Sequence, residues 1–417
     1  MVSEKSLPHF KRSYLFLQGI GSPFLFRLAD RLTADGHTVS KINYNSGDTA
    51  YWGRRQAWSF KGKVSQLSSF MEEKCRTAGI SDIVMLGDRL PIHIPAIELG
   101  RKLGIRTHVY EEGYFRPYWV TLERNGVNAN SRLPRDPAWY RHVSRKLTNI
   151  QPLEQFQSPF RVREMHAVLY NVASMVNLSF FPGFQAHSRC SSPLEYAAGY
   201  LKRVALKPGH ERRDHTVITD LIASQVPYYF FPLQLASDAQ IRDHSNFEGM
   251  IDAMEFVMES FARHAPSDSH LVIKNHPIDV RLTSYSHDIR RFEHKYGIAG
   301  RVAYLETGNL EQLVQHAQGT ITINSTAGGM ALQHNCPIIT LSDPIYNVPG
   351  LTFQGALDRF WQEASPPDPE LFHDFKKVVI HATQINGGFY CDKGIALAVN
   401  SSVASLTAER SPLEELL

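Results

Sequence analysis

Short apolar runs that end in polar turns recur along this chain, and segments of helical periodicity separate them. The stretch YLFLQGIGSPFLFRLADRLTADGHTVSKINY (Tyr14 to Tyr44) predicts a strand, a glycine turn, an amphipathic helix ending at Gly36 and a second strand. The strands SDIVMLGD and IRTHVYEEG follow, with a helix through IPAIELGRKLG between them. This order is typical of parallel sheets covered by helices on both faces.

The pattern is lost between Thr121 and about Gly209, where helical periodicity is still visible around Phe160 to Met175 and Leu194 to Leu206. It then returns with five further strands, YYFFPLQ, LVIKN, RVAYLE, GTITIN and PIITL. We therefore expect an α/β protein with two doubly wound, Rossmann-like domains. The predicted boundaries are 1–209, including a helical crossover, then 210–390, then a C-terminal helix or tail at 391–417.

Composition supports a folded protein with more than one core. The chain has 417 residues, of which 43% are apolar and only 20% are charged, which is the balance of globular proteins. A chain of this length usually forms two domains. Its cysteines stand far apart, without the CxxC or Cys/His spacing of a zinc site, so we expect reduced, structural thiols and no metal: Cys75, Cys190, Cys336 and Cys391.

Targeting signals and charge bear on location and partners. The first residues are basic but contain no apolar core of signal-peptide length, and no stretch approaches eighteen apolar residues. We therefore expect a cytoplasmic protein. The net charge is +3, and the basic cluster Leu201 to Arg213 is either a solvated face or a contact with an anionic membrane surface. The sequence contains no helix-turn-helix, finger or RNP signature, so nucleic acid is not an expected partner.

Ligands of such sheets bind at the carboxyl ends of strands, so polar residues just after strands are the candidate site residues. In QGIGSPF, Gly21 and Ser22 lie in a turn that could bring a ligand close to the backbone, although a plain tight turn fits equally well. In GDRLPIH, Asp88, Arg89 and His93 lie after a strand and at the expected start of a helix. Asp88 could cap that helix, or it could orient a sugar hydroxyl or a histidine in the cleft.

The stretch VYEEG places two carboxylates at the end of a strand. Because side chains alternate along an extended chain, only one of Glu111 and Glu112 can face a given cleft. Glu112, next to Gly113, is the candidate nucleophile or general base. Alternatively, the two acids are solvated in a surface turn.

The stretch LVIKNHPID ends a strand on Lys274, His276 and Pro277. A residue before proline is pushed out of the α region, so His276 should project from the end of the sheet. Lys274 lies two positions earlier on the same face, so one anionic group could meet both side chains. A structural histidine remains the alternative interpretation.

The stretch TINSTAGG has three polar residues between a strand and a helix. Asn324, Ser325 and Thr326 supply hydroxyls and backbone N–H groups at a positive helix end, which suits a phosphate. Ordinary capping explains one of them, and Gly328 with Gly329 would allow close approach of a ligand. The loop SDPIYNVPGLTFQG, 342–355, is expected beside the same site.

Together these motifs resemble a known family, the bacterial capsule polysaccharide Kdo transferases of the KpsS type, which are related to the RkpJ proteins. The resemblance covers about Gln18 to Tyr390. It rests on the following stretches: QGIGS, GDRLPIH, YEEGYFRPYWVTLERNGVN, FFPLQLASDAQIRDHS, LVIKNHPID, TINSTAGG, ALQHNCPIITL and IYNVPGLT.

The resemblance implies a GT-B-like glycosyltransferase whose two Rossmann-like domains face a central cleft. It implies CMP-Kdo as the donor, no cofactor or metal, and a phosphatidylglycerol-type lipid acceptor on which a β-Kdo linker is built. The implied location is peripheral at the inner membrane, with a capsule synthesis or export complex as a further partner. The motifs are also similar to those of bacterial sialyltransferases, which use a CMP-activated sugar.

Carried onto this chain, the resemblance implies roles for individual residues. Glu112 falls on the acidic-glycine catalytic position, His276 and Pro277 fall on the motif that meets the nucleotide phosphate, and Ser325 and Thr326 fall on the nearby phosphate-binding turn. Together with Glu112, we take His276 and Asp88 as the catalytic candidates. The chain-extending relatives have Asp where this chain has Glu112. The role of Glu112 therefore stays open between two alternatives, a nucleophile in a double displacement that retains configuration, or a base. The donor-binding candidates are Lys274, His276, Pro277, Asn324, Ser325 and Thr326, and the acceptor or sugar candidates are Gly21, Ser22, Arg89, His93 and Arg116.

Physical chemistry supports the same types of group without the family name. A CMP-sugar leaves as an anionic phosphate while the sugar becomes oxocarbenium-like, so cations and a carboxylate are needed, as Lys274, His276 and Glu112 supply. The aromatic and basic stretches Arg116–Arg124 and Phe180–Phe184 either contact headgroups or pack in the core. Two other functions remain open, another CMP-sugar transferase and a non-catalytic scaffold that hands lipid-linked sugar to an exporter.

Overall fold

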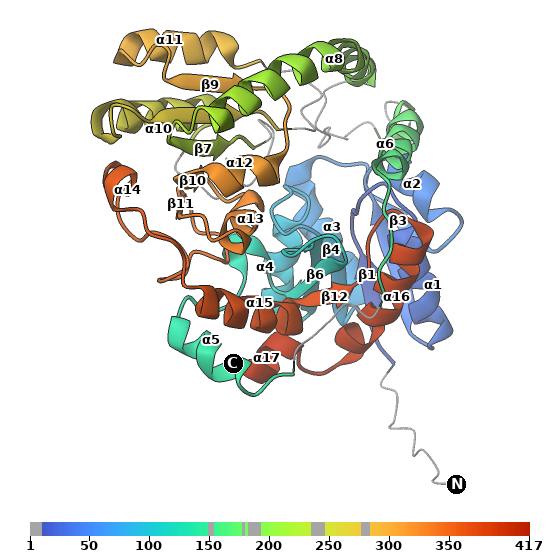
Figure 1. Cartoon of the computed structure of the whole chain (residues 1–417). Coiled ribbons are helices and arrows are strands. Elements are labelled where there is room, and N and C mark those ends of the chain that lie inside the picture. The colour runs from blue at the N-terminus through green and yellow to red at the C-terminus, as the bar shows by residue number, and fades with distance from the viewer. Residues whose placement is uncertain (1–10, 149–153, 177–179, 182–192, 235–246, 277–283) are drawn as a thin grey trace. The chain divides into compact units, whose positions relative to one another are not determined.

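The computed structural model describes residues 11–148, 154–176, 180–181, 193–234, 247–276 and 284–417 (Figure 1). The chain divides into two compact units. Unit 1 comprises Met1–Arg132, Asn149–His187 and Val379–Leu417, and unit 2 comprises Leu133–Thr148 and Ser188–Val378. Each unit is built around its own sheet.

Unit 1 contains, within its described residues, a seven-stranded sheet of order β12-β6-β5-β4-β1-β2-β3. The strands β3, β2, β1, β4 and β5 are parallel, whereas β6 and β12 are antiparallel to their neighbours. Their bounds are β1 Ser13–Phe16, β2 Thr38–Asn43, β3 Ala57–Ser59, β4 Asp82–Leu86, β5 Arg106–Glu112, β6 Trp119–Arg124 and β12 Gln384–Asn386. Tyr14, Leu15 and Phe16 are all fully buried, because helices cover both faces and a continuous apolar run is then required.

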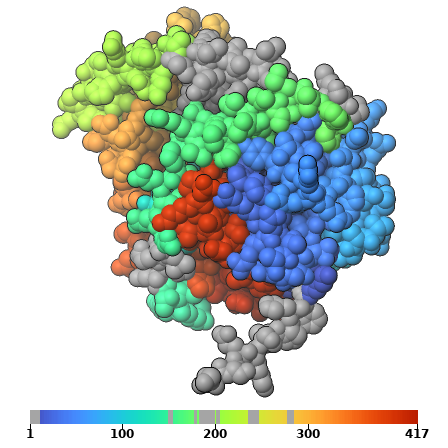
Figure 2. Space-filling model, turned by 90° about the vertical axis from the view of Figure 1, so that its right-hand side faces the viewer, coloured from blue at the N-terminus to red at the C-terminus, as the bar shows by residue number. Residues whose placement is uncertain are grey.

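The helices of unit 1 form two cores, one on each face of the sheet. The first core contains Phe24 and Leu28 of α1 with Ile395 and Ala398 of α16, and the second contains Met71 of α3 and residues of α4. Figures 1 and 2 both show the C-terminal α16 beside the N-terminal α1. The bounds are α1 Phe24–Ala34, α2 Ser46–Trp52, η1 Val64–Gln66, α3 Leu67–Thr77, α4 Ile94–Leu103, η2 Asn128–Asn130, α6 Phe160–Ser174, α16 Asp392–Thr407 and α17 Pro412–Leu416.

Three arginines from other parts of unit 1 donate hydrogen bonds to the C-terminal end of α16 and hold this segment in the unit. Arg12 donates a hydrogen bond to the carbonyl of Thr407 (2.7 Å), and Arg124 donates one to the carbonyl of Ala408 (2.8 Å). Arg106 also reaches the Ala408 carbonyl, at 3.4 Å. The last carbonyls of a helix have no partner within the helix and carry partial negative charge. Cations from the start of the chain, β5 and β6 therefore fix α16 to the sheet.

Unit 2 contains, within its described residues, a five-stranded parallel sheet of order β11-β10-β7-β8-β9. The strand order reverses between β7 and β10. The strands are β7 Tyr228–Pro232, β8 His270–Lys274, β9 Val302–Leu305, β10 Gly319–Thr322 and β11 Ile338–Thr340. The helices are α5 Pro137–Ser144, α8 Pro193–Ala223, α10 Met250–His264, α11 Ser286–Tyr296, α12 Leu310–His316, α13 Ala327–Gln333, α14 Leu357–Glu363 and α15 Pro369–Thr383, the last of which continues into unit 1.

These two sheets confirm the predicted α/β class with two Rossmann-like halves. The helical periodicity expected around Phe160 to Met175 corresponds to α6, and that around Leu194 to Leu206 lies within α8. That the two halves face a central cleft stays a prediction. Across the described residues, no helix is both long and apolar enough to cross a membrane.

Three of the four cysteines lie in the described residues, and each of them is a free thiol. Burial raises the pKa of Cys75 and of Cys336 to about 11, so both are neutral thiols at physiological pH. Cys391 is half-buried and accepts a hydrogen bond from the backbone N–H of Gly394 at the start of α16. Cys190 lies outside the described residues.

Helix α10 offers a matched test of the unit 2 core. Phe261 is fully buried, with its ring centroid 5.4 Å from that of Trp361, whereas Phe256 on the same helix is 46% exposed. We expect Phe261→Ala to lower the free energy of unfolding by about 3–5 kcal/mol, and Phe256→Ala to cost much less. Denaturant unfolding of the full chain measures both, and equal losses would contradict this core.

Candidate functional site

The strand order of unit 2 reverses between β7 and β10, which is where ligands of doubly wound sheets bind. Gln234 follows β7 and Asn324 follows β10. The side chain of Gln234 donates to Oδ1 of Asn324 (2.7 Å) and accepts from the backbone N–H of Asn324 (3.1 Å). This pair of hydrogen bonds fixes Asn324, one of the residues predicted to bind the donor substrate, at the carboxyl edge of the sheet.

Ser325 and Thr326, also predicted to bind the donor substrate, directly precede α13. Oγ of Ser325 accepts a hydrogen bond from the backbone N–H of Ala327 (3.1 Å), so Ser325 caps the turn, while Thr326 is exposed. The hydroxyl of Tyr346 donates to the carbonyl of Ser325 (2.6 Å). A Cβ on Gly328 would lie 2.3 Å from the Tyr346 ring. The close approach that Gly328 permits is therefore made by a tyrosine of loop 342–355, which lies beside this turn as predicted.

Lys274 is buried at the end of β8, with 5% of the residue exposed. Burial lowers its pKa, and the negative charges of Asp214 and Glu306 partly oppose that shift. Asp214, on α8, is fully buried and accepts hydrogen bonds from the backbone N–H groups of Glu306 (2.9 Å) and Thr307 (2.8 Å). Sequence reasoning missed Asp214, because nothing near it in the sequence marks it as a partner of β8.

His276 lies two residues beyond the end of β8 and is partly buried. Its backbone N–H donates to Oδ1 of Asn275 (2.8 Å), and Nδ2 of Asn275 donates to Oε2 of Glu306 (2.9 Å). Pro277 lies outside the described residues. The structure thus gives Lys274 two carboxylates as electrostatic neighbours, and an anion shared by Lys274 and His276 stays a prediction.

In unit 1 the strand order reverses between β1 and β4. The turn after β1 is covered by Tyr170 of α6, because a Cβ on Gly21 would lie 2.8 Å from Cβ of Tyr170. Ser22 is buried, and its Oγ accepts a hydrogen bond from the backbone N–H of Phe24 (3.2 Å). Gly21 therefore accommodates a side chain of the same unit, and Ser22 closes the turn before α1.

The residues after β4 share one partner that sequence reasoning missed, Asn130 of η2. Asp88 is buried and accepts hydrogen bonds from Nδ2 of Asn130 (2.7 Å) and the backbone N–H of Val127 (3.3 Å), while Arg89 donates to Oδ1 of Asn130 (3.2 Å). The helix cap suggested for Asp88 is not what the structure has, since the N-cap residue of α4 is His93. His93 is fully buried, with Nδ1 2.8 Å from the Gly87 carbonyl.

Glu112 ends β5 and has cationic neighbours on two sides. Nη1 of Arg163, from α6, lies 3.2 Å from Oε1 of Glu112, and Arg116 lies 4.0 Å from Oε2. The hydroxyl of Tyr390 is 3.4 Å from Oε1, and the Arg163 guanidinium stacks 5.0 Å from the centroid of that tyrosine ring. Glu111 instead accepts a hydrogen bond from the backbone N–H of Glu112. The structure thus brings the predicted Glu112 and Arg116 together and adds Arg163 and Tyr390.

The candidate residues therefore form two groups, each at the carboxyl edge of one sheet. Glu112, Asp88 and their neighbours belong to unit 1, whereas Lys274, His276 and Asn324 belong to unit 2. Chemically, the first group offers a carboxylate held by cations, and the second offers a buried amine with hydrogen-bond donors. Nowhere in the described residues do three or more His, Cys, Asp or Glu side chains gather as a metal site would require.

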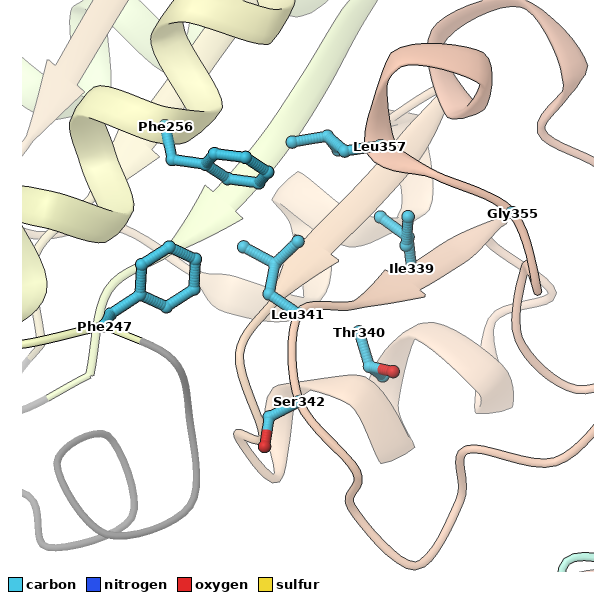
Figure 3. A pocket seen from close by; sticks show the side chains of 8 residues that line it. All are labelled: Phe247, Phe256, Ile339, Thr340, Leu341, Ser342, Gly355 and Leu357. Carbon is cyan, nitrogen blue, oxygen red and sulfur yellow. The ribbon is translucent and has the colours of Figure 1, made fainter.

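A pocket of about 410 Å³ opens in unit 2 beside β11 (Figure 3). Phe247 and Phe256 face Leu341 across it, and Ser342 and Thr340 supply the hydroxyls in its lining. The pocket also includes Ile339, Gly355 and Leu357. The strand β11 is the edge strand of the sheet and pairs with β10, which leads to Asn324, whereas β8, which leads to Lys274 and His276, lies farther from that edge.

Comparison with known proteins identifies the family. Residues 81–390 match the family described as "Capsule polysaccharide biosynthesis protein", and the chain belongs to that family. It is 35% identical over 387 residues to the capsule polysaccharide modification protein LipB of Neisseria meningitidis serogroup A, covering 90% of this chain and 91% of LipB. It is 34% identical over 380 residues to the capsule polysaccharide export protein KpsS of Escherichia coli, covering 91% and 97%. The resemblance to the KpsS type is confirmed.

Among solved structures, the chain resembles the β-Kdo 2,7 transferase of KpsC from Thermosulfurimonas dismutans. The TM-score is 0.43 at 13% identity, with 94% of this chain and 99% of that chain covered. A likeness of this size says nothing about activity.

The burial of Lys274 predicts how the stability of the fold changes with pH. Because its folded pKa is below its unfolded value, the folded state binds fewer protons between those two values, and stability rises with pH in that window. Below the folded pKa of Lys274, its amine stays charged in both states, and the free energy of unfolding is lowered by the full cost of burying that charge. We expect Lys274→Met to raise the melting temperature relative to wild type most at low pH, with the gain shrinking as pH approaches 10.5.

Lys207→Met, at a 58% exposed side chain on α8, is the matched control and should show no such pH dependence. Melting temperatures measured between neutral pH and pH 10 test both variants. A gain for Lys274→Met that grows with pH would contradict the assigned direction of the shift.

Proposed function

We propose that this protein is a glycosyltransferase that moves Kdo from CMP-Kdo to a (lyso)phosphatidylglycerol-type lipid and so starts the β-Kdo linker of capsular polysaccharide. Its membership of the capsule polysaccharide biosynthesis family supports this proposal, as does the order of motifs along the chain. The observation that carries it is Glu112, a carboxylate at a strand end with Arg163 and Arg116 beside it. We further propose that the protein works at the cytoplasmic face of the inner membrane, within a capsule synthesis or export complex.

The donor half of the reaction needs positive charge behind the leaving phosphate. When the bond from the anomeric carbon to CMP breaks, negative charge grows on the phosphate oxygens. Lys274 and His276 at the end of β8, and the Asn324–Ser325 turn after β10, supply the group types that would stabilise this charge. The proposed transfer needs no metal, because these side chains take the role of the cation. One well-placed electrostatic donor contributes roughly 3 kcal/mol, or about a hundredfold in rate.

The sugar half of the reaction needs a carboxylate near the anomeric carbon. In a double displacement, an oxygen of Glu112 attacks this carbon as CMP leaves, and a hydroxyl of the acceptor then displaces Glu112, so that configuration is retained. Arg163 and Tyr390 both approach Oε1, and Arg116 lies farther away, beside Oε2. This asymmetry favours Oε2 as the attacking oxygen. As a base, the same oxygen would instead take the proton of the acceptor hydroxyl.

The acceptor side of the proposal uses unit 1. The side chain of Arg116 is half-exposed next to Glu112, so it can meet an anionic headgroup without leaving the site. Arg89 is oriented by Asn130 near the end of β4. We assign both arginines to the phosphate of the lipid acceptor.

Substitution of the two central residues tests the proposal. With CMP-Kdo and a short-chain lyso-phosphatidylglycerol, the wild type should form a Kdo-lipid detectable by mass spectrometry. Glu112→Gln should lower the rate at least about a hundredfold, because the amide is neither nucleophile nor base, and His276→Ala should do so through lost charge stabilisation. Glu111→Gln is the matched control and should change the rate far less. Normal transfer by Glu112→Gln would refute the site.

Parallel assays with two donors test the sugar. We expect transfer from CMP-Kdo and none from CMP-sialic acid, since the resemblance to the Kdo transferases covers nearly the whole chain. Turnover with CMP-sialic acid alone would indicate the sialyltransferase-like alternative. Stoichiometric binding of the nucleotide without any turnover would indicate a scaffold and overturn the enzymatic proposal.

A further inference from the structure

One face of helix α6 carries an apolar stripe that the described residues leave open. Its six members are between 49% and 58% exposed. They recur at intervals of one, three or four positions and therefore share one side of the helix. The stripe consists of Met165, Val168, Leu169, Val172, Met175 and Val176. Four of these side chains lie on α6, and Met175 and Val176 follow directly after its end. Six large apolar side chains this exposed along one short segment are too many for isolated surface residues and mark an interaction surface.

The opposite face of α6 is fixed to unit 1, so the helix cannot turn the stripe inward. The hydroxyl of Tyr170 bonds to Oδ1 of Asp48 (3.0 Å) and Nδ2 of Asn45 (2.7 Å). The hydroxyl of Tyr51 bonds to Nδ1 of His166 (2.9 Å). A Cβ on Gly47 would lie 2.9 Å from the Tyr170 ring, so α6 and α2 are in close contact. In Figure 1, α6 lies beside α2 in unit 1.

The fixed face of α6 also carries Arg163, the residue that contacts Glu112. Arg163 precedes Tyr170 by seven positions, which is about two turns, so the two side chains share a face. The same helix therefore presents the apolar stripe on one side and orients the candidate catalytic carboxylate from the other.

We propose that the apolar stripe of α6 docks on a lipid surface that contains anionic headgroups. The choice of lipid rests on the proposed lipid acceptor. The charges on the helix support it, because Arg161 lies on the stripe side at the first turn and is exposed, whereas the acid of the helix, Glu164, is partly buried at the edge. Arg161 can extend toward a headgroup phosphate while the apolar side chains enter the lipid.

The size of the stripe argues against a second copy of this chain as its occupant. A stable dimer buries about 800 Å² per partner. Helix α6 has 15 residues and is about 22 Å long, and one side of such a helix offers less area than that. A lipid surface needs no complementary shape, and insertion of about 5–10 Å is enough for an amphipathic helix.

The proposed docking face differs from the two segments that the sequence suggested for membrane contact. Arg116–Arg124 includes β6, in which Val120 to Arg124 are buried in the sheet of unit 1. Core packing, the alternative interpretation, therefore accounts for that strand. Of the other suggested segment, Phe180 is exposed and Phe181 is buried, and 182–184 lie outside the described residues. Among the described residues, the exposed large apolar side chains are instead concentrated between Met165 and Val176.

Vesicle sedimentation of the full-length protein tests the inference. The wild type should bind vesicles of phosphatidylcholine mixed with phosphatidylglycerol, without CMP-Kdo. The double variant Leu169→Asp/Val172→Asp should bind at least about tenfold less, because two carboxylates would enter the apolar layer. Ile251→Asp is the matched control, since this isoleucine is 41% exposed on α10 of unit 2, and its binding should equal that of the wild type. Unchanged melting temperatures verify that the variants fold.

Two further measurements keep the test decisive. Val172→Trp should give a blue shift of fluorescence when vesicles are added, and no shift would overturn docking by this face. Arg161→Gln should reduce the preference for vesicles with phosphatidylglycerol over phosphatidylcholine alone, and an unchanged preference would overturn the role of anionic headgroups. A dimer that Leu169→Asp/Val172→Asp dissociates, without vesicle binding by the wild type, would assign the stripe to a second copy and overturn the proposal.

The outcomes separate this inference from the proposed function. Vesicle binding that depends on the stripe, in a protein that transfers no Kdo, would refute the proposed function and support the docking face. Kdo transfer to a short-chain acceptor by a protein that does not bind vesicles would refute the docking face alone.

Discussion

The hydroxyl of Tyr170 holds α6 against the strand ends of unit 1, and the candidate site around Glu112 depends on that position. It bonds to Asp48 and Asn45, and Nε2 of Gln18 donates to it at 3.1 Å. Asp48 is itself buried and lies 3.8 Å from Nζ of Lys41. A buried network of this kind stabilises the fold only when each polar group has a partner. Removing one partner leaves a buried charge unpaired and lowers the free energy of unfolding by about 3–5 kcal/mol. The network therefore fixes α6 over the ends of β1 and β2. From that position α6 brings Arg163 to Glu112.

Both motif turns with glycines are closed by a tyrosine of the same unit. Tyr170 fills the space above Gly21, and Tyr346 fills the space above Gly328. A glycine between a strand and a helix thus marks close approach of some group, and in these two turns that group belongs to the protein. The glycine pattern alone therefore does not identify a ligand site, and the candidate chemistry rests on the charged groups at the same sheet edges.

The sequence predicted those features that are encoded locally. Buried strands such as Tyr228–Pro232 are continuous apolar runs, and the helix of Phe24–Ala34 has clear periodicity, so class and element order were visible. Glu112 was found because the acidic pair follows an apolar run. Its partners Arg163 and Tyr390 were missed, since they come from segments far along the chain that only the fold brings together. The return of Val379–Leu417 to unit 1 was missed for the same reason, because it depends on the pairing of β12 with β6, two strands far apart in the sequence.

The diameter of a helix sets the distance between a docked lipid and Glu112. An α-helix with side chains is about 10–12 Å across, and the stripe and Arg163 lie on opposite sides of α6. Insertion of the stripe by about 5–10 Å would bring the inner side of the helix close to the level of the headgroups, which occupy about 5–8 Å outside the hydrocarbon. An acceptor hydroxyl on the headgroup could then approach Glu112 without the lipid leaving its layer. A rigid helix requires no conformational switch for this, because its position alone supplies the proximity.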